Sequence, residues 1–279
     1  MSEIRFSVVI PSFNAERYIA AALDSLLDQN YEDIELIVMD GGSRDGTLKI
    51  LEGYRDQINI LMSEPDEGQS DALNKGFGRA SGDFFFWLNS DDLLVPGFLN
   101  RAGDYLSQHP DCKWLTFNTI FIDSDTKINF FYKGPSWNKF CVNGKGPQVD
   151  CPTSIFHRDL FLNSDGFDLR LNFAMDIDLW YQFLGMEHRW HRLNQYGYAF
   201  RMHKGSKTGN EGYGAPSSPE KNAQAALIAE KHHISTSWQA DILVKLNKIL
   251  FTKPPAWLDT HAWHGKLLCD YRPLWQVGS

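Results

Sequence analysis

Two adjacent carboxylates, Asp91 and Asp92, end the stretch FFFWLNSDD, where five apolar residues run into Asn89 and Ser90. Two like charges side by side repel each other, so a positive partner would relieve them. One explanation is a turn into a helix, in which an Asp accepts backbone N–H groups and Pro96 suits the first helical turn. The other is a site for a hard divalent cation, which prefers carboxylate oxygens and keeps positions for phosphate oxygens.

A third carboxylate, Asp40, stands before two glycines in the stretch MDGGSRDGT. A glycine turn with an Asp cap explains this pattern. The functional alternative places the carboxylate against a nucleotide base, whose ring N–H is a donor, while the glycines allow close backbone approach. A dinucleotide site of Rossmann type is disfavoured, because PSFNAE and not GxGxxG follows the first predicted strand, and the chain has no P-loop.

Polar residues also gather at two predicted helix starts. The first, in EPDEGQSDALNKGF, carries on its first two turns Gln69, Asp71, Asn74 and Lys75. They form either a solvent-exposed face or a face that meets a nucleotide bound near the helix N-terminus. The second, in FAMDIDLW, carries Asp176 and Asp178, which point in different directions on a helix. Either is explained as a helix cap, and the functional alternative makes Asp176 a general base.

A basic segment, RMHKGSKT, contrasts with the acidic balance of the chain and gathers Arg201, His203, Lys204 and Lys207. A solvated basic loop explains it. The alternative is a clamp for a diphosphate leaving group, in which a neutral His203 ligates the metal.

The elements that position these residues alternate between strand and helix over the first hundred residues. Apolar, β-branched runs predict strands at 6–10, 34–39, 58–62 and 84–88, and helical spacing predicts helices at 15–27, after Asp45 or Thr47, and at 69–80. Such βαβ units imply a mostly parallel sheet covered by helices. Ligands bind at the carboxyl ends of its strands, where all the polar loops described above fall.

After Pro96 the pattern changes. We expect a helix to about Ser107, a hairpin from 114–122 and 127–132, a loop at 134–149, a short strand at 153–156, a helix from Asp176 and a strand at 196–202. A Gly/Ser-rich lid or linker spans 203–219, and two amphipathic helices and an aromatic tail follow. The predicted domains are 1–215, with halves 1–96 and 97–215, and an extension at 216–279.

Composition excludes several classes. The chain has 279 residues and a formal net charge of −8, which argues against a broad nucleic-acid surface. Its four scattered cysteines are typical of reduced, buried thiols in a cytoplasmic protein. We see neither a signal peptide nor an apolar run long enough for a bilayer. We therefore expect a soluble cytoplasmic protein, and peripheral contact with the inner face of the membrane stays open.

Taken in order, these segments resemble the family 2 inverting glycosyltransferases of the GT-A fold, over roughly residues 5–208. The matching segments are SVVIPSFNAERYI, MDGGSRDGT, EPDEGQSDALNKGF, GDFFFWLNSDD, AMDIDLW and HKGSKT. The fourth matches a sub-group with an LNSDD motif. The resemblance implies an α/β fold with a mostly parallel, Rossmann-like central sheet flanked by helices, a small antiparallel addition and a C-terminal helical extension.

The resemblance also implies roles for individual residues. The base and ribose of the nucleotide would be held by Pro11, Phe13, Asn14, Glu16 and Asp40. The donor site would be lined by Gln69, Asn74 and Lys75, with Asn89, Ser90 and Asp92 contacting the sugar or supporting the metal. Lys207 would lie in a loop that closes over the diphosphate.

Two positions depart from the family pattern. The metal motif Asp-x-Asp here has Asn89 in its first position, which leaves Asp91, with His203, as the expected ligands of Mg²⁺ or Mn²⁺. Where many members have Glu-Asp, this chain has Met175 and then Asp176. The base position is kept, but its acidic neighbour is lost.

The implied activity is that of a metal-dependent hexosyltransferase of the inverting type. Asp176 would take the proton of an acceptor hydroxyl while the sugar leaves a UDP- or dTDP-sugar donor. A saccharide or lipid-linked saccharide acceptor would place the enzyme in bacterial surface polysaccharide or glycoconjugate synthesis. A catalytically inactive, nucleotide-sugar-binding relative is the main alternative. The C-terminal aromatic residues have two explanations, packing on the main domain or on a second subunit of a homodimer, and docking at a membrane interface.

Overall fold

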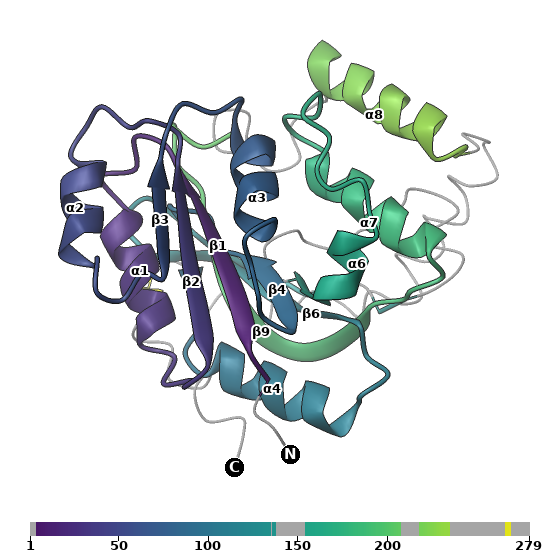
Figure 1. The fold of residues 1–279 in the computed structure, drawn as a ribbon, viewed down its shortest axis with the longest axis horizontal. Coiled ribbons are helices and arrows are strands. Elements are labelled where there is room, and N and C mark those ends of the chain that lie inside the picture. The colour runs from purple at the N-terminus through teal and green to yellow at the C-terminus, as the bar shows by residue number, and fades with distance from the viewer. Residues whose placement is uncertain (1–3, 135, 138–153, 208–217, 235–265, 269–279) are drawn as a thin grey trace.

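The structure is a computed structural model that describes residues 4–134, 136–137, 154–207, 218–234 and 266–268. Their strands form one nine-stranded sheet with the order β3-β2-β1-β4-β8-β6-β9-β5, and β7 pairs with β6. Helices cover both faces of the sheet (Figure 1). The predicted division at residue 215 stays a prediction.

The first half of the chain has the alternating βαβ order that the sequence predicts. The elements are β1 (Phe6–Ser12), α1 (Ile19–Leu27), β2 (Ile34–Asp40), α2 (Thr47–Gly53), β3 (Ile60–Ser63), α3 (Gln69–Phe77) and β4 (Phe84–Trp87). All four strands are parallel. Their register pairs Ser12 with Asp40, and Asp40 with Ser63, so three polar side chains end three neighbouring strands in one row.

The second half adds strands of both directions. Its elements are β5 (Leu93–Leu94), α4 (Phe98–Gln108), β6 (Trp114–Ile122), β7 (Ile128–Tyr132), β8 (Ser154–His157), α6 (Arg158–Leu162), α7 (Met175–Gly185), β9 (His191–Arg201) and α8 (Pro219–Lys231). The predicted hairpin is β6–β7, while β8 inserts antiparallel between β4 and β6. The short elements β5 and α6 were not predicted, because two and five residues carry too little periodicity to detect.

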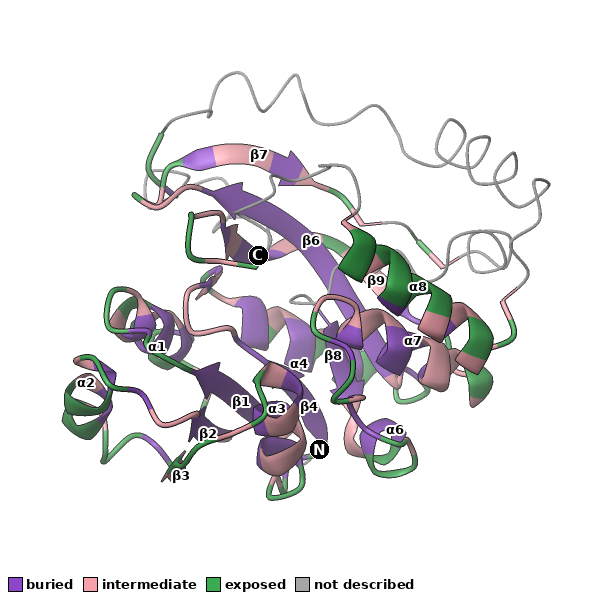
Figure 2. Ribbon diagram, turned by 90° about the horizontal axis from the view of Figure 1, so that it is seen from above, coloured by how far each residue is buried: buried purple, intermediate pink, exposed green. Residues whose placement is uncertain are grey.

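Alternation along β1 divides the core between the two faces of the sheet. Phe6, Val8 and Ile10 face a cluster formed with α1, α2 and α4, and Val9 faces a second cluster formed with α3, α6 and α7. The second cluster is rich in aromatic rings, and Trp180 stacks between Trp87 and Trp114 at centroid distances of 5.8 and 4.9 Å. Figure 2 shows the buried strands between helices whose outer faces are exposed. The edge where the polar loops meet is therefore fixed from both sides.

The expected C-terminal extension is described in two pieces. Helix α8 packs on α7, and residues 266–268 bridge to the hairpin, where the Ile128 N–H donates to the Lys266 carbonyl at 2.8 Å. The second predicted amphipathic helix, the aromatic tail and most of the predicted loop at 134–149 lie outside the described residues. Of the helices that are described, none has the length and apolar character needed to cross a bilayer.

Candidate active site

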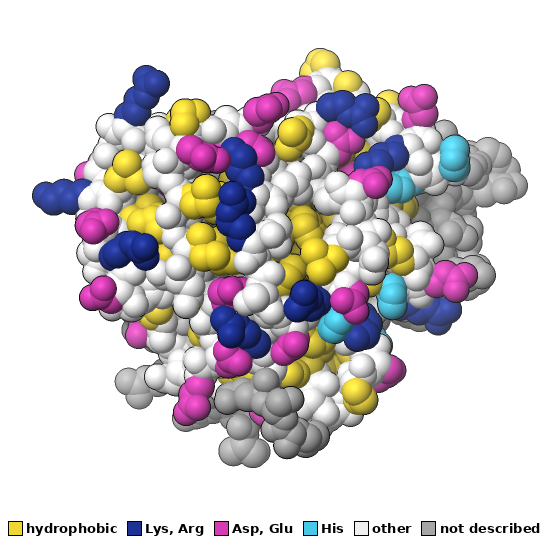
Figure 3. All heavy atoms as spheres, in the orientation of Figure 1, with side chains coloured by type: hydrophobic (Ala, Val, Ile, Leu, Met, Phe, Trp, Pro, Cys, Tyr) yellow, Lys and Arg dark blue, Asp and Glu magenta, His cyan; other side chains and the backbone are white. Residues whose placement is uncertain are grey.

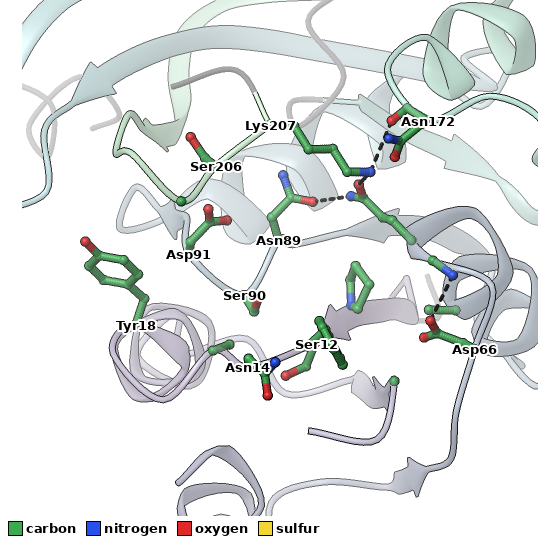
Figure 4. A pocket seen from close by; sticks show the side chains of 18 of the residues that line it. Ser12, Asn14, Tyr18, Asp66, Asn89, Ser90, Asp91, Asn172, Ser206 and Lys207 are labelled. Atoms are coloured by element: carbon green, nitrogen blue, oxygen red, sulfur yellow. Dashed lines mark hydrogen bonds between the residues drawn. The ribbon is translucent and has the colours of Figure 1, made fainter. Parts of the chain in front are cut away.

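A cavity of about 640 Å³ opens at the carboxyl edge of the sheet. Figure 4 shows Asp66 and Asp91 on opposite sides of it, with Asn89 between them. The side chains around it carry both signs of charge, and on the face shown in Figure 3 acidic and basic residues alternate without a single basic field. The lining residues are Pro11, Ser12, Phe13, Asn14, Ala15, Tyr18, Gly41, Asp66, Gly68, Gln69, Ala72, Asn89, Ser90, Asp91, Asn172, Phe173, Met175, Asp176, Phe200, His203, Gly205, Ser206 and Lys207.

One side of the cavity, the sheet-edge wall, consists of residues 11–15, Gly41 and Asp66. The loops after β1 and β2 are tied together by hydrogen bonds. The Gly41 N–H donates to the Ser12 carbonyl at 2.8 Å, the Asn14 N–H donates to Ser43 Oγ at 2.8 Å, and the Arg44 N–H donates to Asn14 Oδ1 at 2.9 Å. These bonds give partners to backbone groups that lie beyond the ends of the strands and are not paired within the sheet. The wall is therefore preorganised.

Asp40 lies behind this wall and not in it. Its carboxylate is 2% exposed and accepts the N–H groups of Gly42 and Ser43 at 3.1 and 2.9 Å, the Ser43 hydroxyl, and the Ser63 hydroxyl at 2.7 Å. The glycine turn with an Asp cap, the simpler of the two explanations, describes this arrangement. Asp40 is not among the residues that line the cavity, so its position does not support the expected contact with a base.

Asp66, in contrast to Asp40, lines the sheet-edge wall of the cavity. One of its oxygens accepts the Gly68 N–H at 2.9 Å, and a Cβ on Gly41 would come within 2.7 Å of the other, Oδ2. Gly41 therefore leaves the space that the Asp66 carboxylate uses. In the same wall, the Ser12 hydroxyl is buried and has no hydrogen-bond partner among the described residues. Sequence reasoning missed both, although Asp66 stands in the EPDEG stretch at the same predicted sheet edge.

Asn89 lies in the cavity with both ends of its amide in use. Its Oδ1 accepts from Gln69 Nε2 at 2.8 Å, and its Nδ2 donates to Asp92 Oδ2 at 2.8 Å. Gln69 in turn accepts from Lys207 Nζ at 3.1 Å. The amide therefore serves as a link between α3 and the turn that follows β4.

Asp92 is the buried anchor of that turn. It is 1% exposed and also accepts the Tyr198 hydroxyl at 2.8 Å and the Arg201 N–H at 2.7 Å. Burial, and then the charge of Asp91, raise the pKa of Asp92 well above its ordinary value, and burial likewise raises the pKa of Tyr198. Asp92 thus supports the site from behind and does not line it.

Asp91 and His203 lie next to each other at a second side of the cavity. Asp91 Oδ2 lies 2.9 Å from His203 Nε2, and the Tyr18 ring packs 4.9 Å from the imidazole. A carboxylate oxygen and an imidazole nitrogen that face one opening suit a divalent cation whose other ligands are water and phosphate oxygens. The described residues contain no group of three His, Cys, Asp or Glu side chains that could hold a metal without such help.

A third side of the cavity, the helix wall, consists of Asn172, Phe173, Met175 and Asp176. These residues precede α7 or belong to its first turn. The hydroxyl of Ser70 on α3 holds this segment, because it lies 3.2 Å from the Leu171 carbonyl and 3.1 Å from Met175 Sδ. Asp176 reaches the cavity, where an acceptor proton could be taken.

The structure thus brings together Pro11, Phe13, Asn14, Gln69, Asn89, Ser90, Asp91, Asp176, His203 and Lys207. Besides Asp40 and Asp92, three other predicted residues make contacts elsewhere. Glu16 accepts the Gly46 N–H at 2.9 Å, Asn74 binds the backbone of Phe167 through both ends of its amide at 2.8 Å, and Lys75 pairs with Glu64 and Asp71. These contacts hold loops and α3 in place. The nucleotide and donor contacts expected of Asp40, Glu16, Asn74 and Lys75 therefore have no support from position, whereas Asp92 lies where a supporting residue was expected.

Comparisons with known proteins agree with this architecture. A family model described as Glycosyl transferase family 2 matches residues 7–161. The chain is 41% identical over 184 residues to an uncharacterized glycosyltransferase of Rickettsia prowazekii, which covers 63% of this chain and 58% of that protein. It is 32% identical over 111 residues to the poly(ribitol-phosphate) beta-N-acetylglucosaminyltransferase TarS of Staphylococcus aureus, which covers 38% of this chain and 19% of TarS. The chain spans less than two thirds of the length of either relative.

Solved structures show the same fold. The crystal structure of S. aureus TarS 1–349 in complex with UDP-GlcNAc matches with a TM-score of 0.64 and 20% identity, covering 98% of this chain and 78% of that one. The mannosyltransferase PcManGT from Pyrobaculum calidifontis, in complex with GDP-Man and Mn²⁺, matches with a TM-score of 0.57 and 18% identity, covering 98% and 83%. The α/β fold of GT-A type that we expected is confirmed.

Proposed function

Because the chain belongs to glycosyl transferase family 2, we propose that it transfers a sugar from a nucleoside diphosphate sugar to an acceptor hydroxyl, with inversion at the anomeric carbon. The observation that carries this proposal is a single cavity bordered by Asp66 and Ser12, by the Asp91–His203 pair, and by Asp176. These groups suit, in turn, a base, a diphosphate and an acceptor.

The base of the donor lies against Asp66 in this proposal. A carboxylate only accepts hydrogen bonds, so at the ring position it suits the N–H of uracil, thymine or guanine. Adenine and cytosine present an unprotonated ring nitrogen at that position, and its lone pair would repel the carboxylate. The Ser12 hydroxyl, buried without a partner among the described residues, would donate to a carbonyl oxygen of the same base. Phe13, which is 62% exposed at the rim, offers a ring for stacking. A UDP- or dTDP-sugar satisfies these contacts.

The diphosphate lies against Asp91 and His203. These two side chains would hold Mg²⁺ or Mn²⁺. When bound, the cation supplies charge that stabilises the departing nucleoside diphosphate. Lys207, whose ammonium lies 3.1 Å from Gln69 Oε1, adds a second positive charge to the same side of the cavity.

Asp176 is the general base of the transfer. Its carboxylate takes the acceptor hydroxyl proton as the acceptor oxygen forms a bond to the anomeric carbon. The bond from that carbon to the diphosphate oxygen breaks on the opposite face, and its electron pair leaves with the nucleoside diphosphate. One displacement of this kind inverts the configuration. The likeness to TarS, which is named for its action on poly(ribitol-phosphate), favours a role in surface polymer synthesis. The saccharide or lipid-linked saccharide acceptor that we propose rests on the resemblance in sequence to the family.

A binding panel tests this function. The chain is titrated calorimetrically with UDP-GlcNAc, UDP-glucose, dTDP-glucose, GDP-mannose and, as a control for the base, CDP-glucose, with and without Mn²⁺. We expect a uridine or thymidine sugar to bind most tightly, more tightly with Mn²⁺, and to be hydrolysed slowly when water replaces the acceptor. If no nucleotide sugar binds, the proposal is wrong. Tight binding without any turnover supports the alternative of an inactive nucleotide-sugar-binding module.

A further inference from the structure

Gln224, on α8, binds the backbone of the helix wall. Its Oε1 accepts three consecutive N–H groups, from Asn172 at 3.1 Å, Phe173 at 2.9 Å and Ala174 at 3.3 Å. The side chain is 7% exposed, and its Nε2 lies 3.4 Å from Glu220 Oε1. A buried amide oxygen with three backbone donors fixes the path of that backbone, because any other path leaves the donors unpaired.

The segment that Gln224 holds has no local substitute for this contact. Helix α7 begins at Met175 after Ala174, whose side chain makes no capping hydrogen bond. Helix starts are usually held by a Ser, Thr, Asp or Asn at that position. Here the acceptor comes instead from another helix, about fifty residues further along the chain.

The same three residues connect the cavity to its basic segment. Asn172 and Phe173 line the cavity, and the Asn172 carbonyl accepts from Lys207 Nζ at 3.1 Å, so this peptide is held from both sides. Asp176 follows two residues after Ala174. A shift of this segment would therefore move the carboxylate relative to a bound donor.

Helix α8 also has an anchor that is independent of Gln224. Asp178, which is fully buried, accepts from Lys231 Nζ at 2.9 Å, His232 Nε2 at 2.7 Å and Gln182 Nε2 at 2.9 Å. Ile228 packs in the core beside α7. The C-terminal end of α8 is therefore held by Asp178, independently of Gln224. The contact of Gln224 can thus serve to orient residues 172–174.

We propose that Gln224 is a positioning residue for sugar transfer, so that α8 is part of the catalytic unit although it lies outside residues 7–161, which the family model matches. The proposal rests on the function proposed above, with Asp176 as the base. Gln224 acts by holding residues 172–174 in the conformation that directs Asp176 at the acceptor oxygen.

The test compares three variants in the full chain, with hydrolysis of the best-bound nucleotide sugar of the panel as the activity. Gln224→Met keeps the volume but removes the acceptor. We expect kcat to fall about 10- to 100-fold, because a misplacement near 1 Å can cost about 100-fold. The Kd for UDP should stay within about twofold, because the sheet-edge wall is untouched. The exchange Glu220→Gln with Gln224→Glu keeps an acceptor at 224 and a donor at 220, and it should restore most of kcat.

Lys231→Met is the matched control, because it loosens α8 at its other anchor without touching residues 172–174. We expect its Tm to fall at least as far as that of Gln224→Met, with kcat near the wild-type value at a temperature where both are folded. If Gln224→Met keeps its kcat, or if both variants lose kcat in step with Tm, Gln224 has only a structural role and the proposal is wrong. A wild-type chain that binds no nucleotide sugar contradicts the proposed function itself, which separates the two failures.

Discussion

The two walls of the cavity are built in different ways. The sheet-edge wall is held by hydrogen bonds between two adjacent loops at the ends of strands that are already in register. The Gly41 N–H donates to the Ser12 carbonyl, and the side chains of Asn14 and Ser43 accept backbone N–H groups across the same pair of loops. The helix wall is held by single side chains from distant parts of the sequence, namely Ser70, Lys207 and Gln224. The shape of the sheet-edge wall is therefore set by the sheet, whereas the shape of the helix wall depends on a few tertiary contacts.

This difference matches the tasks that we propose for the two walls. The nucleotide part of the donor is the same in every reaction cycle, and a preorganised edge binds it at little cost in conformational entropy. An acceptor has to be aligned with the base within a fraction of an ångström, and the side chains that set this alignment can change without disturbing the sheet. We therefore expect changes in the helix wall to alter kcat and changes in the sheet-edge wall to alter donor affinity.

The largest effect should follow from Asp176→Asn, in the helix wall. The amide cannot take a proton, so kcat for transfer or hydrolysis should fall about 10²- to 10⁴-fold. The Kd for UDP should stay within about twofold, since the wall that holds the nucleotide is unchanged. Steady-state kinetics and calorimetry measure the two quantities.

Asp165→Asn, an exposed carboxylate before the same helix, is the control and should leave both quantities unchanged. If Asp176→Asn lowers UDP affinity as much as it lowers kcat, donor affinity and kcat are not controlled by separate walls.

A smaller effect, on affinity, should follow from Gly41→Ala in the sheet-edge wall. The new Cβ would come within 2.7 Å of Asp66 Oδ2 and displace the carboxylate. Losing a hydrogen bond to a charged group costs about 1.5–3 kcal/mol, so UDP should bind roughly 10- to 100-fold more weakly. Asp66→Asn should weaken UDP by a similar factor and narrow its advantage over CDP, because an amide can donate to the cytosine ring nitrogen.

Gly53→Ala is the matched control, since a Cβ there meets no atom within 4 Å. Unchanged UDP binding in both Gly41→Ala and Asp66→Asn would remove Asp66 from the base site and return attention to Asp40.

The same contrast explains what could be predicted from the sequence. Strand ends, helix starts and the polar loops between them follow from local patterns, so β1 to β4 and the edge that carries Asp91 were predicted. Asp40 was assigned to the base and Asp66 was missed, because the choice depends on which carboxylate accepts the Ser43 and Ser63 hydroxyls. That information lies in register and packing, not in residue spacing.

The helix wall could be predicted only in part. Asp176 was identified from its motif, but nothing in the spacing links Gln224 to residues 172–174 across about fifty positions. Asn74 was assigned to the donor on the pattern of its helix, whereas its amide is used to hold Phe167. A polar face on a helix shows that contacts are made, and only the fold shows with what.

The smallest expected effect concerns acid. Asp168, in the loop before α7, has its pKa lowered to about 2, chiefly by its hydrogen bond from Arg170, and Lys231 of α8 lies 3.7 Å away. An unfolded Asp has a pKa near 3.9, so this carboxylate stabilises the fold above about pH 4 and the stabilisation is lost as pH falls towards 2. Asp168→Asn should therefore lower Tm at pH 7, and the difference from wild type should shrink between pH 4 and 2.

The Asp168–Arg170 contact holds the loop that leads into the helix wall, so hydrogen exchange at pH 3 should rise in residues 166–171 before it rises in residues 11–15. Equal loosening of both segments would show that acid does not distinguish this loop from the sheet-edge wall.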